Sequence, residues 1–105
     1  MIDLTFITGN VSHDDLSFLE NGDLCSQVDC LKEDMLQVEY PSSLLLDVGW
    51  YPSFDPNGSF QVRVIKNYDW SQPVFFSRAI SMPSLIVEIS NAQAEIGKVF
   101  MAGNS

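Results

Sequence analysis

The 105-residue chain is poor in the residues that carry most enzyme chemistry. It has one histidine, His13, and two cysteines, Cys25 and Cys30. A single histidine excludes a nuclease mechanism that uses two of them, and it excludes a histidine-rich metal site. The spacing of the two cysteines does not match a zinc site, and no second cysteine pair completes one. We therefore expect no metal and no cofactor, and we interpret both cysteines as small buried apolar residues in a reducing compartment.

The sequence also lacks the short motifs that mark common active sites. It contains no GxGxxG, no P-loop, no HExxH and no GxSxG. A Cys25–His13 pair is possible by composition, but His13 is expected to begin a helix, where a neutral surface role is usual. Fourteen acidic residues always allow some acid–base pair, so their number alone indicates nothing about catalysis. The sequence therefore predicts a protein that is not an enzyme.

Long apolar runs are absent as well. No run approaches the roughly 20 residues needed to cross a bilayer. Residues 1–8 lack the basic region and cleavage site of a signal peptide. We therefore expect a cytoplasmic protein with no membrane partner. The length and the 46% hydrophobic content predict a single domain over residues 1–105.

Basic residues are scarce, and their distribution is uneven. Five basic residues stand against fourteen acidic ones, which gives a formal net charge of −9. Residues 1–52 hold ten of the acids and one base, Lys32, whereas residues 53–105 hold four of each sign. The first half therefore carries the whole net charge. Such a surface repels nucleic acid and anionic membranes and attracts a basic protein, although a role in solubility alone is the alternative.

Hydrophobic periodicity predicts a sheet followed by a helix. Alternation of apolar and polar residues predicts strands over 35–41, 44–52, 59–67 and 74–80. Between the second and third of these, SFDPNGS reads as a turn, because Pro56 presets φ and Asn57–Gly58 tolerates positive φ. Apolar residues then recur at helical spacing after a possible N-cap at Ser81, which predicts an amphipathic helix over 81–100.

The N-terminal third gives weaker signals. Residues 1–8 could form a short strand. Ser12 as N-cap, Asp15 in the capping-box position and Asn21–Gly22 as a stop predict a helix from His13 to Glu20. Residues 24–34 fit one helical face without a clear cap. The expected fold class is α+β: an antiparallel meander of about four or more strands, a short N-terminal helix and a C-terminal amphipathic helix packed on the sheet.

The two tryptophans have different surroundings. Trp50 lies in a strand that the C-terminal helix must cover, so we favour a place in the core over a binding platform. Trp70 lies in a polar loop beside Asp69, and either role fits it.

One half of the chain shows a pattern that goes beyond ordinary hairpin signals. From Leu45 to about Ile96 it includes DVGWYPSFDPNGSFQVRVIKNYDWSQPVFFSRAISMPSLIVEI: a strand ending in Gly-Trp-Tyr, an acidic glycine turn, F-x-V-R-V-I-K, D-W-x-x-P, a further strand and a capped helix. This segment resembles small immunity proteins of bacterial toxin systems, including the CdiI-type proteins of contact-dependent growth inhibition. The resemblance implies a cytosolic protein that binds one toxin domain and blocks its active site, without catalytic residues of its own. Residues 1–44 show no such resemblance.

The acidic half is thus also the half outside the resemblance, and we expect it to choose the partner. Toxins that attack RNA or DNA present basic clefts to phosphates, and an acidic surface would steer onto such a cleft. The alternative is a small acidic ligand-binding or adaptor domain that uses the aromatic hairpin. The residues expected to bind the partner are Asp14, Asp15, Glu20, Asp23, Asp29, Glu33, Asp34 and Trp70.

Overall fold

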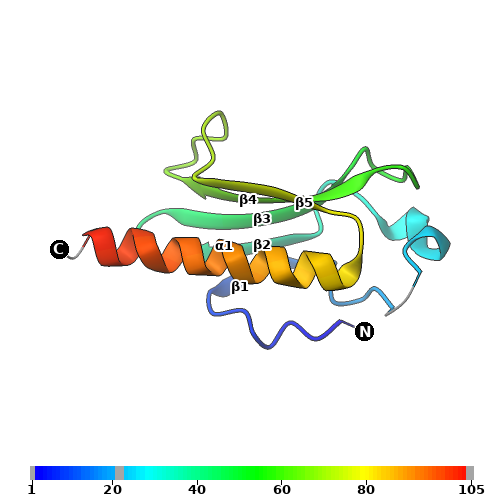
Figure 1. Cartoon of the computed structure of the whole chain (residues 1–105), viewed down its shortest axis with the longest axis horizontal. Coiled ribbons are helices and arrows are strands. Elements are labelled where there is room, and N and C mark those ends of the chain that lie inside the picture. The colour runs from blue at the N-terminus through cyan, green and yellow to red at the C-terminus, as the bar shows by residue number, and fades with distance from the viewer. Residues whose placement is uncertain (1, 21–22, 104–105) are drawn as a thin grey trace.

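A five-stranded antiparallel sheet carries one long helix on one face in the computed structural model, which describes residues 2–20 and 23–103 (Figure 1). The strands follow one another across the sheet in sequence order, and the helix comes last in the chain. The predicted α+β class, the meander and the C-terminal helix are confirmed. The elements are β1 (Asn10–Asp14), a 3₁₀ segment η1 (Cys25–Cys30), β2 (Leu36–Tyr40), β3 (Leu44–Tyr51), β4 (Ser59–Lys66), β5 (Phe75–Ala79) and α1 (Met82–Gly103).

The core lies between α1 and the sheet. Alternate residues of the central strands point to one face, so the apolar set of β3 and β4 meets the apolar stripe of α1. Trp50 lies opposite Phe60 in the β3–β4 register, and their rings meet edge to face with centroids 4.9 Å apart. Trp50 is 3% exposed, which confirms its predicted place in the core. Other buried members of this layer are Leu46, Val48, Val62, Val64, Leu85, Ile89 and Ala92.

The predicted turn after β3 is present, and it is built around the Trp50 indole. The Asp55 carbonyl oxygen accepts hydrogen bonds from the Gly58 amide (2.9 Å) and from Trp50 Nε1 (2.8 Å). A Cβ atom on Gly58 would lie 2.6 Å from Trp50 Nε1 and 2.7 Å from the Tyr51 carbonyl oxygen. Glycine is therefore required by the close approach of the turn to the ring.

The predicted helix over His13–Glu20 is wrong. Residues 10–14 instead pair with β2, with Val11 opposite Val38 and Asp14 opposite Leu36. Asp14 Oδ1 then accepts hydrogen bonds from the amides of Leu16 and Ser17, both at 2.9 Å, and so forms a turn and not a helix start. The turn directs Leu16 into the core, where it is fully buried. A residue that can cap a helix can also hold a turn, and here the sheet pairing decided between them.

The remaining predictions for residues 1–34 are in part wrong. Residues 2–8 form no strand, and the stop signal at Asn21–Gly22 lies outside the described residues. Residues 24–34 form only the 3₁₀ segment η1. Cys30 is exposed, which contradicts its predicted burial, because it ends η1 at the surface; the side chain of Cys25 lies outside the described part. Ser81 Oγ accepts a hydrogen bond from the Ser84 amide (3.3 Å), as expected of an N-cap.

No helix within residues 2–20 and 23–103 is both long enough and apolar enough to cross a membrane.

Candidate functional site

The sheet face opposite α1, here called the open face, carries a row of side chains that crosses all five strands. The strand registers place His13, Gln37, Asp47, Arg63 and Phe76 opposite one another in turn. The last four belong to the face opposite the apolar core set, because residues alternate between faces along a strand. His13 joins them because the register shift after Val11 brings it opposite Gln37. The row is therefore fixed by the backbone pairing and not by loops.

Asp47, in the middle strand, is the buried charged residue of this row. It is 4% exposed, and Gln37 Nε2 donates a hydrogen bond to its Oδ1 at 3.3 Å. Burial is the largest cause that raises the pKa of the Asp47 carboxyl; the Gln37 hydrogen bond and the positive charge of Arg63 oppose it. The row thus holds a carboxyl group whose ionisation costs free energy.

Arg63, the next member of the row, is held by aromatic rings. Its guanidinium carbon lies 5.2 Å from the Tyr51 ring centroid and 5.4 Å from that of Phe76. Arg78 lies 5.5 Å from the same Phe76 ring, from the adjacent position on β5. Arg63 also donates a hydrogen bond to Gln61 Oε1. The β4–β5 side of the open face is therefore cationic and aromatic.

The opposite corner of the sheet, where β1 ends and β2 begins, is acidic. Lys32 Nζ lies 2.7 Å from Asp15 Oδ2, and His13 Nε2 lies 3.2 Å from the same oxygen. His13 Nε2 also lies 3.1 Å from the Asp34 carbonyl oxygen. The hydrogen bond from Lys32 is the largest cause that lowers the pKa of Asp15. We call this corner, with Asp15, Asp29, Glu33 and Asp34, the acidic end.

A hollow of about 310 Å³ opens at the acidic end. Phe18 is 68% exposed beside it, an unusual position for a large apolar side chain among charges. Phe18 was not predicted as a site residue, because it fell within the helix expected over His13–Glu20 and no pattern around it indicated an exposed ring. The residues that line this Phe18 hollow are Asp15, Phe18, Leu19, Asp29, Cys30 and Lys32.

The acids predicted to bind a partner divide into three groups. Asp15, Asp29, Glu33 and Asp34 belong to the acidic end, and the last three are exposed. Asp14 is engaged in its turn, where its Oδ2 also accepts a hydrogen bond from Ser17 Oγ at 2.6 Å. Glu20 and Asp23 are exposed, and their backbone carbonyls accept hydrogen bonds from Gln27 Nε2.

Trp70 is not brought together with these acids. It lies between β4 and β5, in the connection that projects from the end of the sheet opposite the acidic end (Figure 1). Its side chain is 47% exposed. A single small contact cannot include both Trp70 and the Phe18 hollow.

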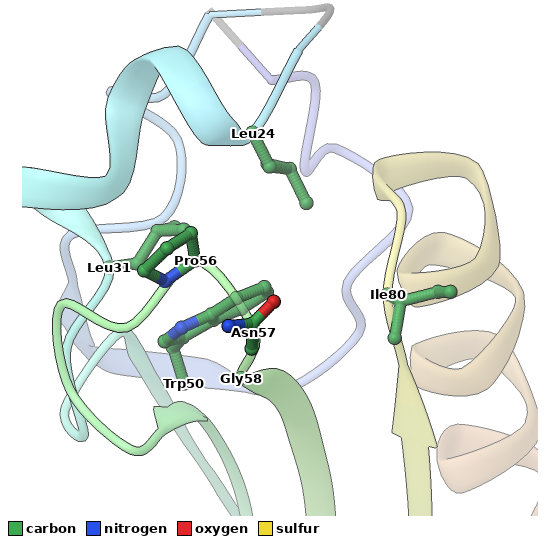
Figure 2. A pocket seen from close by; sticks show the side chains of 7 residues that line it. All are labelled: Leu24, Leu31, Trp50, Pro56, Asn57, Gly58 and Ile80. Carbon is green, nitrogen blue, oxygen red and sulfur yellow. The ribbon is translucent and has the colours of Figure 1, made fainter.

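A second, apolar pocket of about 280 Å³ lies beside the β3–β4 turn (Figure 2). Figure 2 shows the Trp50 ring beside Asn57 and Gly58, with Ile80 across the opening and Leu24 above it. Ile80 is 77% exposed, whereas Leu31 is buried. The Trp50 indole N–H already donates a hydrogen bond to the Asp55 carbonyl oxygen. A ligand in the pocket would therefore contact the face of the ring and not its N–H. The remaining lining residue is Pro56.

Comparisons with protein-family models, with curated proteins and with solved structures found no match to this chain. Among residues 2–20 and 23–103, no three His, Cys, Asp or Glu side chains are grouped so that they could hold a metal ion. Assignment of a function therefore rests on the residues of this chain alone.

Proposed function

We propose that this chain is an immunity protein of the CdiI type, which binds a cognate toxin domain and neutralises it by occluding its active site. The toxin is a basic nuclease, and the protein acts in the cytoplasm of the cell that it protects. The observation that carries the proposal is the acidic end, where Asp29, Glu33 and Asp34 are exposed and an exposed phenylalanine, Phe18, lines one hollow with Asp15 and Asp29. The resemblance of the second half of the chain to such immunity proteins supports the same function.

Charge placement supports a basic partner. Asp29, Glu33 and Asp34 are exposed, and among the described residues Lys32 is the one Lys or Arg side chain at this corner, where it is engaged by Asp15. The other basic residues lie on β4, β5 and α1. A field of one sign at one end of a small protein accelerates encounter with a surface of the opposite sign.

The Phe18 hollow supports a specific contact within that field. Phe18 offers an exposed ring, and Asp15 and Asp29 line the same hollow. An arginine of the partner could place its guanidinium over the ring and donate to a carboxylate at the same time. Nuclease clefts that hold phosphates carry such arginines, so occupation of the hollow and closure of the cleft would coincide.

Charge reversal tests the steering. The probe is the purified C-terminal nuclease domain of the secreted protein encoded next to this chain. We expect Asp29→Lys and Asp34→Lys each to slow its association about tenfold at low salt, with a smaller effect at high salt. Glu39→Lys is the matched control, because it makes the same charge change at the opposite end of β2. Equal on-rates for all three variants in stopped-flow measurements, or the absence of an adjacent toxin gene, would contradict the proposal.

Stoichiometry tests the mode of action. Nuclease activity should fall linearly as the protein is added and reach zero near one equivalent, because an occluding inhibitor is consumed by binding. His13→Ala and Cys25→Ala should protect as well as the parent, since neither residue is asked to do chemistry. Protection far below one equivalent would instead indicate an enzyme that modifies the toxin or repairs its target.

The Trp50 pocket favours a second candidate, a small acidic ligand-binding or adaptor domain. The pocket joins Trp50, Leu24, Leu31 and Ile80 in a volume that suits a small apolar molecule or one apolar side chain. A shift of the Trp50 indole N–H resonance in NMR spectra on addition of toluene, abolished by Ile80→Asp but retained in Phe18→Ser, would favour this function.

A further inference from the structure

We propose that two copies of this chain associate through β5, as an antiparallel pair of edge strands centred on Ser77. The paired strands would join the two five-stranded sheets into one continuous sheet. The inference does not depend on the toxin-binding proposal, because β5 is separated from the acidic end by β2, β3 and β4.

The backbone groups of β5 that face outward can be identified from its pairing. The Val64 carbonyl accepts a hydrogen bond from the Val74 amide (2.9 Å), so Val64 directs its backbone groups toward β5. Its neighbour Arg63 therefore faces β3, because successive residues of a strand hydrogen-bond to opposite sides. Phe76 lies opposite Arg63, and Phe76 and Arg78 must therefore direct their amides and carbonyls away from β4. These are the groups that a further strand would pair with.

The two edges of the sheet differ in how well they are protected. At β1 the register shifts between Val11 and His13, and such a bulge disturbs the regular row of groups that another chain could join. The β4–β5 pairing runs without a shift from Phe75 to Ala79. β5 contains no proline or lysine, and its one charge is Arg78. It thus lacks most devices that keep edge strands apart.

Three exposed apolar side chains lie at this edge. Val74 is 41% exposed, Phe76 44% and Ile80 77%. No acidic residue occurs between Asp69 and Glu88, although the chain carries a net charge of −9. Two copies can therefore approach along β5 with less repulsion than along the acidic end.

The sequence of β5 is self-complementary when Ser77 lies on the two-fold axis. Phe76 of each copy then lies opposite Arg78 of the other, and both residues direct their backbone groups across the new interface. Ile80, which directly follows β5 and is 77% exposed, would lie near the new interface and lose water-exposed apolar surface. The Arg78–Phe76 contact that exists within one chain would be repeated between chains. A second copy is hence the occupant that fits this edge.

Sedimentation equilibrium over a wide range of protein concentration tests the proposal. We expect the mass to rise from that of the 11.7 kDa chain toward twice that value as concentration increases. Added salt should favour the dimer, because it screens repulsion between two acidic chains. Arg78→Pro should keep the protein monomeric, since proline removes an outward amide and leaves the β4 pairing intact. A wild-type chain that stays monomeric at all concentrations, or an Arg78→Pro variant that dimerises as before, overturns the proposal.

Two further measurements keep the test decisive if Arg78→Pro fails to fold. Phe76→Arg should abolish the dimer by opposing two arginines, and Phe76→Arg/Arg78→Phe should restore it by exchanging the two members of each pair. In hydrogen exchange, the Phe76 and Arg78 amides should gain protection as concentration rises, whereas the Ser77 amide, which faces β4, should not change. Failure of the double variant to recover the dimer, or concentration-dependent protection at β1 instead, contradicts the β5 register.

Discussion

Burial of the Asp47 carboxyl disfavours its ionisation, and the neighbouring polar groups offset this effect only in part. Its carboxyl is removed from water in the middle of the open face, and Gln37 and Arg63 favour its charged form. The charges of Asp34 and His13 also reach it, the first raising and the second lowering its pKa. Burial outweighs these favourable contacts, so the pKa of the Asp47 carboxyl in the folded protein lies above its ordinary value of 3.8.

Because the pKa of Asp47 is raised by folding, there is a pH range above 3.8 in which Asp47 is protonated in the folded protein but ionised in the unfolded chain. Stability should therefore fall as pH rises from about 3.8 through the raised pKa, and then level off. We expect Asp47→Asn to be more stable than the parent at neutral pH, with a difference that shrinks as pH falls toward 3.8, in urea unfolding at a series of pH values. Asp29→Asn, at an exposed site, should show no such trend. A less stable Asp47→Asn protein at neutral pH would mean that the carboxylate makes a net favourable contact.

Among the elements, β1 and the turn after it show how a strand was formed where a helix was expected. Both a helix start and this turn use a short acidic side chain to accept backbone N–H groups. The outcome was set by pairing with β2 and by the burial of Leu16 and Leu19, which anchor the turn to the core. Asp14 consequently holds this turn, and its predicted partner contact stays a prediction.

Removal of the Asp14 side chain should lower stability and leave partner recognition unchanged. We expect Asp14→Ala to cost about 1 kcal/mol of unfolding free energy, because two amides and one hydroxyl lose their acceptor. Asp14→Asn should cost less, since an amide oxygen can still accept. Ser12→Ala controls for β1, because Ser12 Oγ makes one exposed hydrogen bond to the Gln37 carbonyl. Complete loss of toxin association in an Asp14→Ala protein that is still stably folded would show that Asp14 contacts the toxin.

At the scale of the whole molecule, the sheet separates charges of opposite sign. The acidic end lies where β1 gives way to β2, whereas Arg63 and Arg78 lie on β4 and β5. Exposed carboxylates crowded at one end repel one another in the folded state more than in an extended chain.

Screening should relieve that repulsion. We expect the Tm to rise when NaCl is increased from about 0.02 M to about 0.5 M, with the largest change at low ionic strength. In Asp29→Lys, which removes part of the repulsion, the same increase in salt should raise the Tm less. A Tm that falls with salt in differential scanning calorimetry would show that ion pairs such as Lys32–Asp15 outweigh the repulsion.

Local patterns were sufficient for much of the fold. The four strands from Leu36 to Ala79 and the helix that begins at Met82 were predictable because alternation and helical spacing record which face each residue buries. The turn before Gly58 was predictable because proline fixes φ and because asparagine and glycine are common in turns, although the positive φ of this loop falls at Phe54. The acidic half was visible in composition, although the hollow that Phe18 shares with Asp15 and Asp29 was not.

The sequence by itself determined the order of the strands, the core face of each, the turn at Asp55–Gly58 and the sign of the charge. Tertiary structure alone decided that residues 10–14 form an edge strand, that Asp47 and Arg63 share one row, and that Trp70 lies far from the acidic end. The physical reason is the range of the interactions. Periodicity and turn chemistry act between residues a few positions apart. The pairing of β1 with β2 instead joins residues more than twenty apart, and its free energy is gained only when the partner strand is in place.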